Sequence, residues 1–187
     1  MEDDGVKKVC HALFESDSAL EHLDLSGNNV ERRGAKQIAD YIRDSGGKLK
    51  VLCLDDNDLT SKGVVHIASA FHGSEDGHSI ENIQLNYTMC GAIGARALID
   101  AYGPDGKDLP NLKKICLDGN SFKEDIVGEL EVAFDNKLVE MEENDSDGEA
   151  DDDLSDDDSD EEDDDDGEDE NGEVDALTDA MNKSLVV

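Results

Sequence analysis

Apolar and polar residues alternate over a short stretch that recurs four times along the chain. The four copies read LEHLDLSGN from Leu20, LKVLCLDDN from Leu49, IENIQLNYT from Ile80 and LKKICLDGN from Leu112. Each follows the pattern L-x-x-L-x-L-x-x-N, with Thr88 replacing the Asn once, and the starts are 29, 31 and 32 residues apart. Because alternate side chains of a strand point to opposite faces, each L-x-L core predicts a short strand with one apolar face.

A pair of small residues stands six positions after the Asn position in the first three copies, where a helical spacing of apolar residues begins. The pairs are Gly34-Ala35, Gly63-Val64 and Gly94-Ala95. A small residue here would let each helix lie close to its neighbour. Residues 5–14 fit the helical half of an earlier repeat, and SFKEDIVGELEVAF after Asn120 keeps the helical spacing without the small pair. We predict that this last segment forms a capping helix.

A strand, a turn asparagine and a helix that recur every 29–32 residues are typical of a leucine-rich repeat of the ribonuclease-inhibitor type. No single repeat can bury its own apolar face, so the stack of repeats is the domain. The predicted fold class is therefore an α/β solenoid of about four repeats, curved and right-handed, with a parallel sheet inside and helices outside. It covers residues 1–139 as a partial repeat, 1–19, and the repeats 20–48, 49–79, 80–111 and 112–139, the last with the capping helix.

The charge divides the chain near the same place. The formal net charge is −34, and residues 140–175 hold 24 acidic side chains and no Lys or Arg. Such a segment cannot offset its chain entropy by burial, so residues 140–187 are predicted to form a disordered acidic tail that attracts basic protein surfaces. No basic stripe exists to bind nucleic acid, and no apolar run is long enough to insert into a membrane. The N-terminus lacks a signal-peptide layout, which favours a cytoplasmic location.

A solenoid commonly binds partners through its strand face and the adjoining loops. The outward positions of the four predicted strands are polar and acidic on balance, so they predict a docking surface for a basic partner; the alternative is an ordinary solvated sheet face. Val51 and Cys116 belong to this row. Its candidate partner-binding residues are His22, Asp24, Ser26, Cys53, Asp55, Asn82, Gln84, Asn86, Lys114 and Asp118.

The sequence offers little chemistry of its own. Cys53 and Cys116 would lie two strands apart, about 10 Å by the usual strand spacing, which is beyond disulfide reach. There is no Cys-x-x-Cys motif, no Cys/His cluster at a recognisable spacing and no phosphate-binding glycine loop. We therefore predict no catalytic residue, no metal and no cofactor. Asn28 is interpreted as the repeat asparagine, which bonds exposed backbone in a ladder, and Asn29 as a turn residue.

The repeats, the closing LKKICLDGNSF segment with its following helix, and the acidic tail together resemble the C-terminal part of the Ran GTPase-activating protein family. The resemblance implies an activator of the small GTPase Ran in nucleocytoplasmic transport, rather than an enzyme with its own chemistry, located in the cytoplasm and near the nuclear envelope. In that family an asparagine of an N-terminal repeat helps to position the catalytic glutamine of Ran. No position of this chain matches that motif, so we expect a truncated form that lacks the catalytic repeats.

An alternative hypothesis places the protein in a different functional class. The acidic leucine-rich nuclear phosphoproteins also join repeats to a polyacidic segment, and this resemblance would imply a histone-binding or chaperone-like interaction protein. That family has shorter repeats without the small-residue step before a helix. The period of 29–32 residues therefore favours the GTPase-activating family.

Overall fold

The computed structural model describes residues 2–16, 20–45, 48–72, 78–103 and 106–144, all within the first of two compact units, Met1–Leu154. The strands are β1 (His22–Asp24), β2 (Val51–Cys53), β3 (Asn82–Gln84) and β4 (Lys114–Cys116). The helices are α1 (Asp3–Glu15), α2 (Arg32–Asp44), α3 (Thr60–Ser69), α4 (Ala92–Tyr102) and α5 (Glu124–Phe134), followed by the 3-10 turn η2 (Asp135–Lys137). Residues 145–187 lie outside the described residues, so the disorder of the acidic tail stays a prediction.

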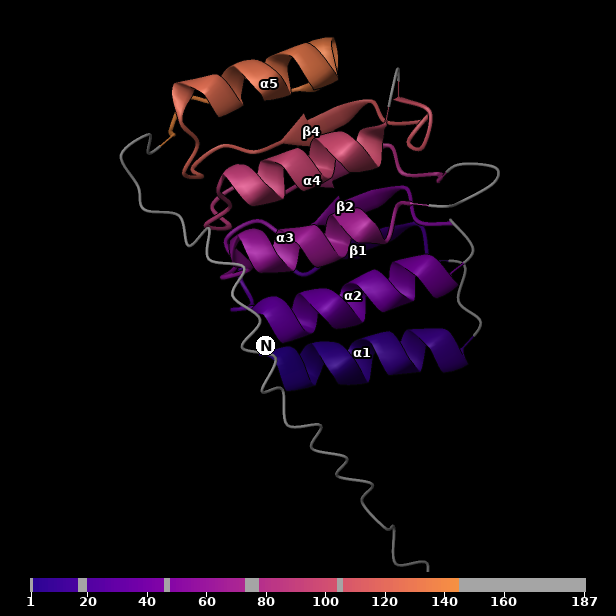
Figure 1. Cartoon of the computed structure of the whole chain (residues 1–187). Coiled ribbons are helices and arrows are strands. Elements are labelled where there is room, and N and C mark those ends of the chain that lie inside the picture. The colour runs from indigo at the N-terminus through magenta and orange to yellow at the C-terminus, as the bar shows by residue number, and fades with distance from the viewer. Residues whose placement is uncertain (1, 17–19, 46–47, 73–77, 104–105, 145–187) are drawn as a thin grey trace, which may run out of the picture. The chain divides into compact units, whose positions relative to one another are not determined.

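The four strands form one parallel sheet in the order β1-β2-β3-β4 (Figure 1). Leu23, Leu52, Ile83 and Ile115 are in register across it, and each is the fourth residue of its repeat. A helix follows every strand, as the repeat period predicts. The fold is therefore the predicted α/β leucine-rich-repeat solenoid.

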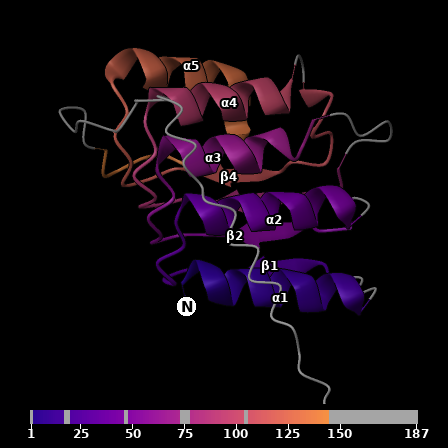
Figure 2. The same ribbon diagram turned by 60° about the horizontal axis from the view of Figure 1, so that its bottom comes forward.

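All five helices lie on one side of the sheet and stack in chain order from α1 to α5 (Figures 1 and 2). The small-residue step explains their close approach. A Cβ built on Gly63 would lie 3.2 Å from the Cβ of Ala35, and a Cβ built on Gly94 would lie 3.2 Å from that of Val64. Gly128 of α5 differs from these glycines, because nothing lies within 4 Å of a Cβ built on it.

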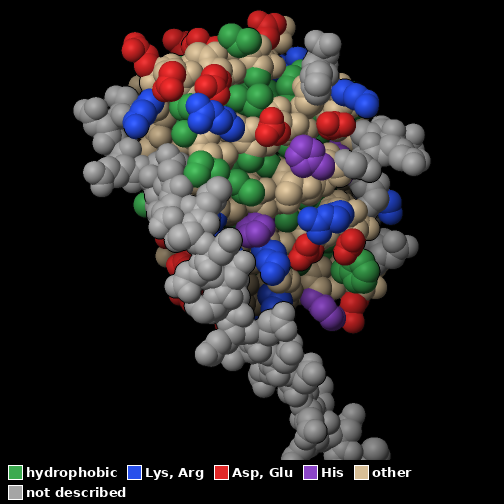
Figure 3. All heavy atoms as spheres, viewed as in Figure 1, with side chains coloured by type: hydrophobic (Ala, Val, Ile, Leu, Met, Phe, Trp, Pro, Cys, Tyr) green, Lys and Arg blue, Asp and Glu red, His purple; other side chains and the backbone are tan. Residues whose placement is uncertain are grey.

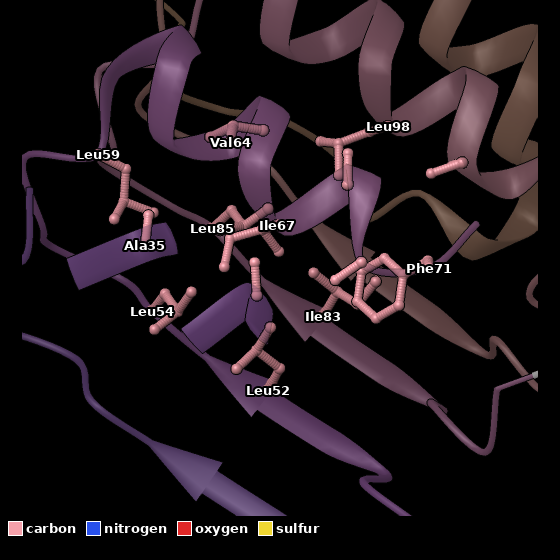
Figure 4. Close-up of a cluster of buried hydrophobic side chains, with 14 of the residues drawn as sticks. Ala35, Leu52, Leu54, Leu59, Val64, Ile67, Phe71, Ile83, Leu85 and Leu98 are labelled. Carbon is pink, nitrogen blue, oxygen red and sulfur yellow. The ribbon is translucent and has the colours of Figure 1, made fainter. Parts of the chain in front are cut away.

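The core fills the layer between sheet and helices, and it runs through all the repeats (Figure 4). Leu52 and Leu54 point inward from β2 and its following turn, and Ile67 and Phe71 point into the same layer from the helical side. All four side chains are at most 1% exposed. Since each repeat supplies one layer, removal of any layer would expose the apolar face of the next.

The helical side itself carries acidic and basic side chains interspersed with apolar ones, and acidic groups gather toward α5 (Figure 3). Cross-repeat pairs are found there, such as Arg96 with Glu129, whose two nitrogen–oxygen distances are both 3.0 Å. No helix in the described part of the chain is both long and apolar enough to cross a membrane.

A closing segment, residues 138–144, follows the capping helix and packs against the last repeat. Leu138 forms a parallel bridge with Ile115, and the Val139 N–H donates to the Ile115 carbonyl at 3.0 Å. Asn144 accepts the N–H of Phe122 at 2.8 Å and donates to its carbonyl at 2.6 Å. The sequence placed residues 140–144 in the tail, whereas the structure packs them against repeat 4. The backbone of Leu138 and Val139 pairs with β4 where the next strand would lie, which limits exposure of the edge of β4.

We expect limited proteolysis of the full chain at acidic residues to leave a resistant fragment that ends at or beyond Asn144. The hydrogen bonds of Val139 and Glu143 hold the backbone on both sides of Glu140, and cleavage there requires an extended, unpaired backbone. Asn144→Ala should move the first cut upstream into residues 140–143. Mass spectrometry of the fragments identifies the cleavage sites. Equally fast cleavage of the unsubstituted chain at Glu140 and in the acidic tail would contradict the protection by the closing segment.

Candidate protein-binding face

The predicted partner-binding residues all lie on or just after the four strands, on the side of the sheet that faces away from the helices. His22, Asp24 and Lys114 are exposed, and most of the others are half-buried. Cys53 and Cys116 depart from the expected outward exposure, because each is only 6% exposed. The two thiols therefore contribute little accessible surface, and the polar side chains of the row make up most of the rest.

Asp55, Asn86 and Asp118 turn out to have a structural role. The Asp55 carboxylate accepts the N–H of Asn86 at 2.8 Å, and the Asn86 side-chain oxygen accepts the N–H of Asp118 at 2.8 Å. The Asp118 carboxylate in turn accepts the N–H of Glu143 at 2.7 Å. This chain of hydrogen bonds ties three consecutive loops and the closing segment together, so the loops after the strands are held in fixed positions.

A second ladder, buried beneath the first, is built from the repeat asparagines. The Asn57 side-chain oxygen accepts the N–H groups of Asn28 and Val30 at 3.1 and 2.9 Å, and its amide donates to the Leu25 and Leu54 carbonyls. Asn57 is only 2% exposed. The ladder predicted from the sequence is therefore confirmed. Asn28 donates to the Leu25 and Ser26 carbonyls, which leaves its side chain committed to the turn.

Asn120 makes the same contacts in the fourth repeat. Its neighbour in the third repeat is Thr88, which stands where the other repeats have Asn. The Asn120 oxygen accepts from the N–H groups of Thr88 and Cys90 at 3.1 and 3.0 Å. Its amide donates to the Leu85 and Leu117 carbonyls, both at 2.8 Å. The Thr88 hydroxyl donates to the Leu85 carbonyl at 3.0 Å, so the shorter side chain still satisfies its own turn.

A row of alternating charges borders the start of the strands. Lys50 pairs with Glu21 and Lys113 pairs with Glu81, each with an N–O distance of 2.7 Å. The pKa of Lys50 is raised because its ammonium donates to Glu21, and the pKa of Glu81 is lowered because its carboxylate accepts from Lys113. These pairs are exposed and thus add little stability, but they give one border of the face both signs of charge.

The thiols on the face are unreactive as they stand. Burial, reinforced by the negative Asp24, raises the pKa of Cys53 to about 11. Burial also raises the pKa of Cys116. The raised pKa of each thiol disfavours, in the absence of a bound metal, the thiolate that nucleophilic or redox chemistry needs. None of the four cysteines, all of which lie in the described ranges, forms a disulfide.

Three side chains that the sequence did not associate come together across the first two strands. His22, Asp24 and Cys53 each direct one possible metal-ligand atom into a group in which all atoms lie within 4.8 Å of one another. The Asp24 carboxylate accepts the Ser26 N–H at 3.0 Å, and this bond lowers the pKa of Asp24. The sequence predicted no metal site because Asp24 and Cys53 are 29 positions apart and only strand pairing makes them neighbours.

Tyr87 and Met89 are exposed apolar side chains of the loop after β3 that the sequence analysis did not single out. They are 45% and 56% exposed and have positive φ angles of 53° and 57°. The Tyr87 ring lies directly over Gly119, and its hydroxyl donates to Glu143 at 2.8 Å. The available signal was positional, because the residue equivalent to Tyr87 is Gly27 in the first repeat and Gly119 in the fourth.

Comparison with known proteins agrees with the repeat architecture. A family model described as Leucine Rich repeat matches residues 18–39. RAN GTPase-activating protein 2 of Arabidopsis thaliana is 34% identical over 153 residues, which is 80% of this chain and 27% of that protein. NACHT, LRR and PYD domains-containing protein 13 of Homo sapiens is 32% identical over 88 residues, 47% of this chain and 8% of that protein. The matched regions are thus small parts of much longer relatives.

Proposed function

The repeats form a leucine-rich-repeat region similar to that of a Ran GTPase-activating protein, and on that premise we propose that the chain binds Ran and serves GTPase activation in nucleocytoplasmic transport. The observation that carries this proposal is the 34% identity, which extends over 80% of the chain rather than over a single repeat. The proposed site of action is the cytoplasm, near the nuclear envelope.

The binding surface we propose is the strand face with the loops that follow it. Two ladders of hydrogen bonds hold these loops, so a partner meets a preorganised surface and little ordering entropy is lost on binding. Asp24 and Asp55 give the face acidic groups that suit a basic patch. The acidic segment 140–175 would attract the same kind of patch at longer range and raise the association rate at low salt.

We assign no catalytic side chain to the described residues. Asn28 bonds the carbonyls of its own turn, Asn57 belongs to the buried ladder, and Arg96 pairs with Glu129 on the helical side. Acceleration of GTP hydrolysis requires a group that orients the attacking water or stabilises the transition-state charge at the phosphate. We therefore propose that this chain supplies binding, while catalytic positioning in the family depends on other repeats.

Gln84→Arg should weaken binding to Ran·GTP about tenfold, because Gln84 lies on β3 in the middle of the proposed face and a longer charged side chain there blocks close contact. Gln37→Arg is the matched control. It introduces the same charge on α2, at an equally half-buried position on the helical side, and should leave the dissociation constant within about twofold. Surface plasmon resonance at two salt concentrations measures both, and affinity should fall as salt rises.

Single-turnover hydrolysis by Ran·GTP with excess full chain tests the catalytic half of the proposal. We expect little acceleration under conditions where binding is saturated. A large acceleration would show that the chain carries a catalytic group, and it would overturn the division of roles. Absence of any binding, or an equal loss with Gln84→Arg and Gln37→Arg, would overturn the proposed partner or the proposed face.

A further inference from the structure

We propose that His22, Asp24 and Cys53 form a binding site for a divalent transition metal of the zinc type. Two of the ligands come from β1 and the third from β2, the next strand of the sheet. No other group of three His, Cys, Asp or Glu ligand atoms within the described ranges is close enough to hold an ion. The inference does not depend on the identity of the protein partner.

The distances are close to those of a tetrahedral site. Typical zinc–sulfur, zinc–nitrogen and zinc–oxygen bonds, at tetrahedral angles, place ligand atoms about 3.4–3.6 Å apart. The Cys53 Sγ lies 4.0 Å from His22 Nε2, and all three ligand atoms fall within 4.8 Å. His22 and Asp24 are exposed, so their side chains can close the difference by small rotations without repacking the core.

The combination of donors selects the kind of metal. A thiolate and an imidazole favour zinc over magnesium or calcium, which prefer oxygen ligands. Binding of the ion would displace the Cys53 thiol proton to solvent, and the resulting thiolate together with the Asp24 carboxylate would balance the charge of a divalent ion. That balance matters because Cys53 is only 6% exposed, and a buried net charge would be costly.

A local hydrogen bond restrains the Asp24 carboxylate. This carboxylate accepts the Ser26 N–H at 3.0 Å, as metal-binding carboxylates commonly accept a hydrogen bond from a neighbouring group. Three protein ligands leave a fourth position for water or for a side chain of a partner. The site lies on the strand face, so a partner bound there could reach that position.

The repeat itself does not require these residues. The position of Cys53 is repeated by Cys116 on β4, which is also 6% exposed, but Lys114 stands there where β1 has His22. On β3 the equivalent positions hold Asn82 and Gln84. A lysine and two amides offer no comparable set of ligands, so the cluster is specific to the first two strands. Cys116 thereby provides a matched control within the same chain.

Cobalt(II) titration of the full, reduced chain tests the site, since Co²⁺ replaces Zn²⁺ and reports a bound thiolate by its near-ultraviolet charge-transfer absorption. Excess Mg²⁺ occupies the carboxylates of the acidic segment without competing for sulfur. We expect the thiolate band to saturate at one Co²⁺ per chain and to disappear when Zn²⁺ is added. Cys53→Ser should abolish the band, whereas Cys116→Ser should leave it unchanged.

Exposed ligands provide variants that do not disturb the core. His22→Gln and Asp24→Asn should each weaken Co²⁺ binding at least about tenfold while the urea unfolding midpoint stays unchanged. They decide the matter if Cys53→Ser fails to fold. The proposal is overturned if the unsubstituted chain shows no thiolate band, if Cys116→Ser loses the band as Cys53→Ser does, or if neither exposed-ligand variant weakens binding.

Discussion

Asn120→Ala is expected to lower the free energy of unfolding by about 3–5 kcal/mol, because the substitution leaves several buried backbone groups without partners, at about 1–3 kcal/mol for each unsatisfied group. The side chain of Asn120 is 1% exposed and bonds the N–H groups of Thr88 and Cys90 together with the carbonyls of Leu85 and Leu117. Water cannot replace it without opening the turn between β4 and α5. Urea unfolding followed by circular dichroism measures the change.

Asn136→Ala is the matched control for this experiment. Asn136 lies in η2 and is exposed, so its loss should change the free energy of unfolding by less than about 0.5 kcal/mol. A cost for Asn120→Ala that is no larger than the cost for Asn136→Ala would show that the ladder contributes nothing to stability. A fall in the denaturant dependence together with the midpoint would instead indicate that the last repeat unfolds separately, as nearest-neighbour stability in repeat proteins allows.

The sheet could be predicted to the residue because the repeat sets its register. Leu23, Leu52, Ile83 and Ile115 occupy one position of the pattern, and the structure pairs them directly. The helices follow for the same reason, since Gly63 and Gly94 mark where each comes close to its neighbour. Self-similarity is a strong signal because every copy tests the others.

The closing segment could not be predicted in the same way. It shares only scattered features with the repeat, such as Leu138 beside Ile115 and Asn144 beside Phe122, and its acidic residues resemble those of the tail. Its order comes from backbone groups of β4 and its loop that need partners. Composition alone does not reveal that requirement, so the sequence analysis placed the start of the tail at residue 140.

The candidate site was predictable in outline and not in detail. Alternation along each strand identified which side chains share the face. It did not reveal that Asp55 bonds the next loop, or that Cys53 is buried beside His22, because both facts depend on side-chain packing between neighbouring repeats. Strand pairing brings Asp24 directly opposite Cys53, a relation that a search for local metal motifs does not include.

The second large effect concerns the helical layer: Gly94→Leu should destabilise the chain by about 3 kcal/mol or more through overpacking. Even the first atom of the new side chain would lie 2.5 Å from Cys90 Sγ and 3.3 Å from the Ser61 Cα, so a full leucine must push α4 away from α3. Cys90 is fully buried and cannot move into solvent. The gain in helix propensity over glycine, roughly 1 kcal/mol, is too small to compensate.

Gly128→Leu is the control that separates packing from propensity, and it should have the opposite sign. Gly128 also lies within a helix, but nothing lies within 4 Å of a Cβ built there, so leucine gains helix propensity without a clash. We expect its free energy of unfolding to rise by roughly 0.5–1 kcal/mol. Thermal unfolding of the two variants side by side gives the answer: similar shifts for both would mean that the small-residue step has no role in bringing the helices together, whereas opposite shifts locate its role at the contact of α4 with α3.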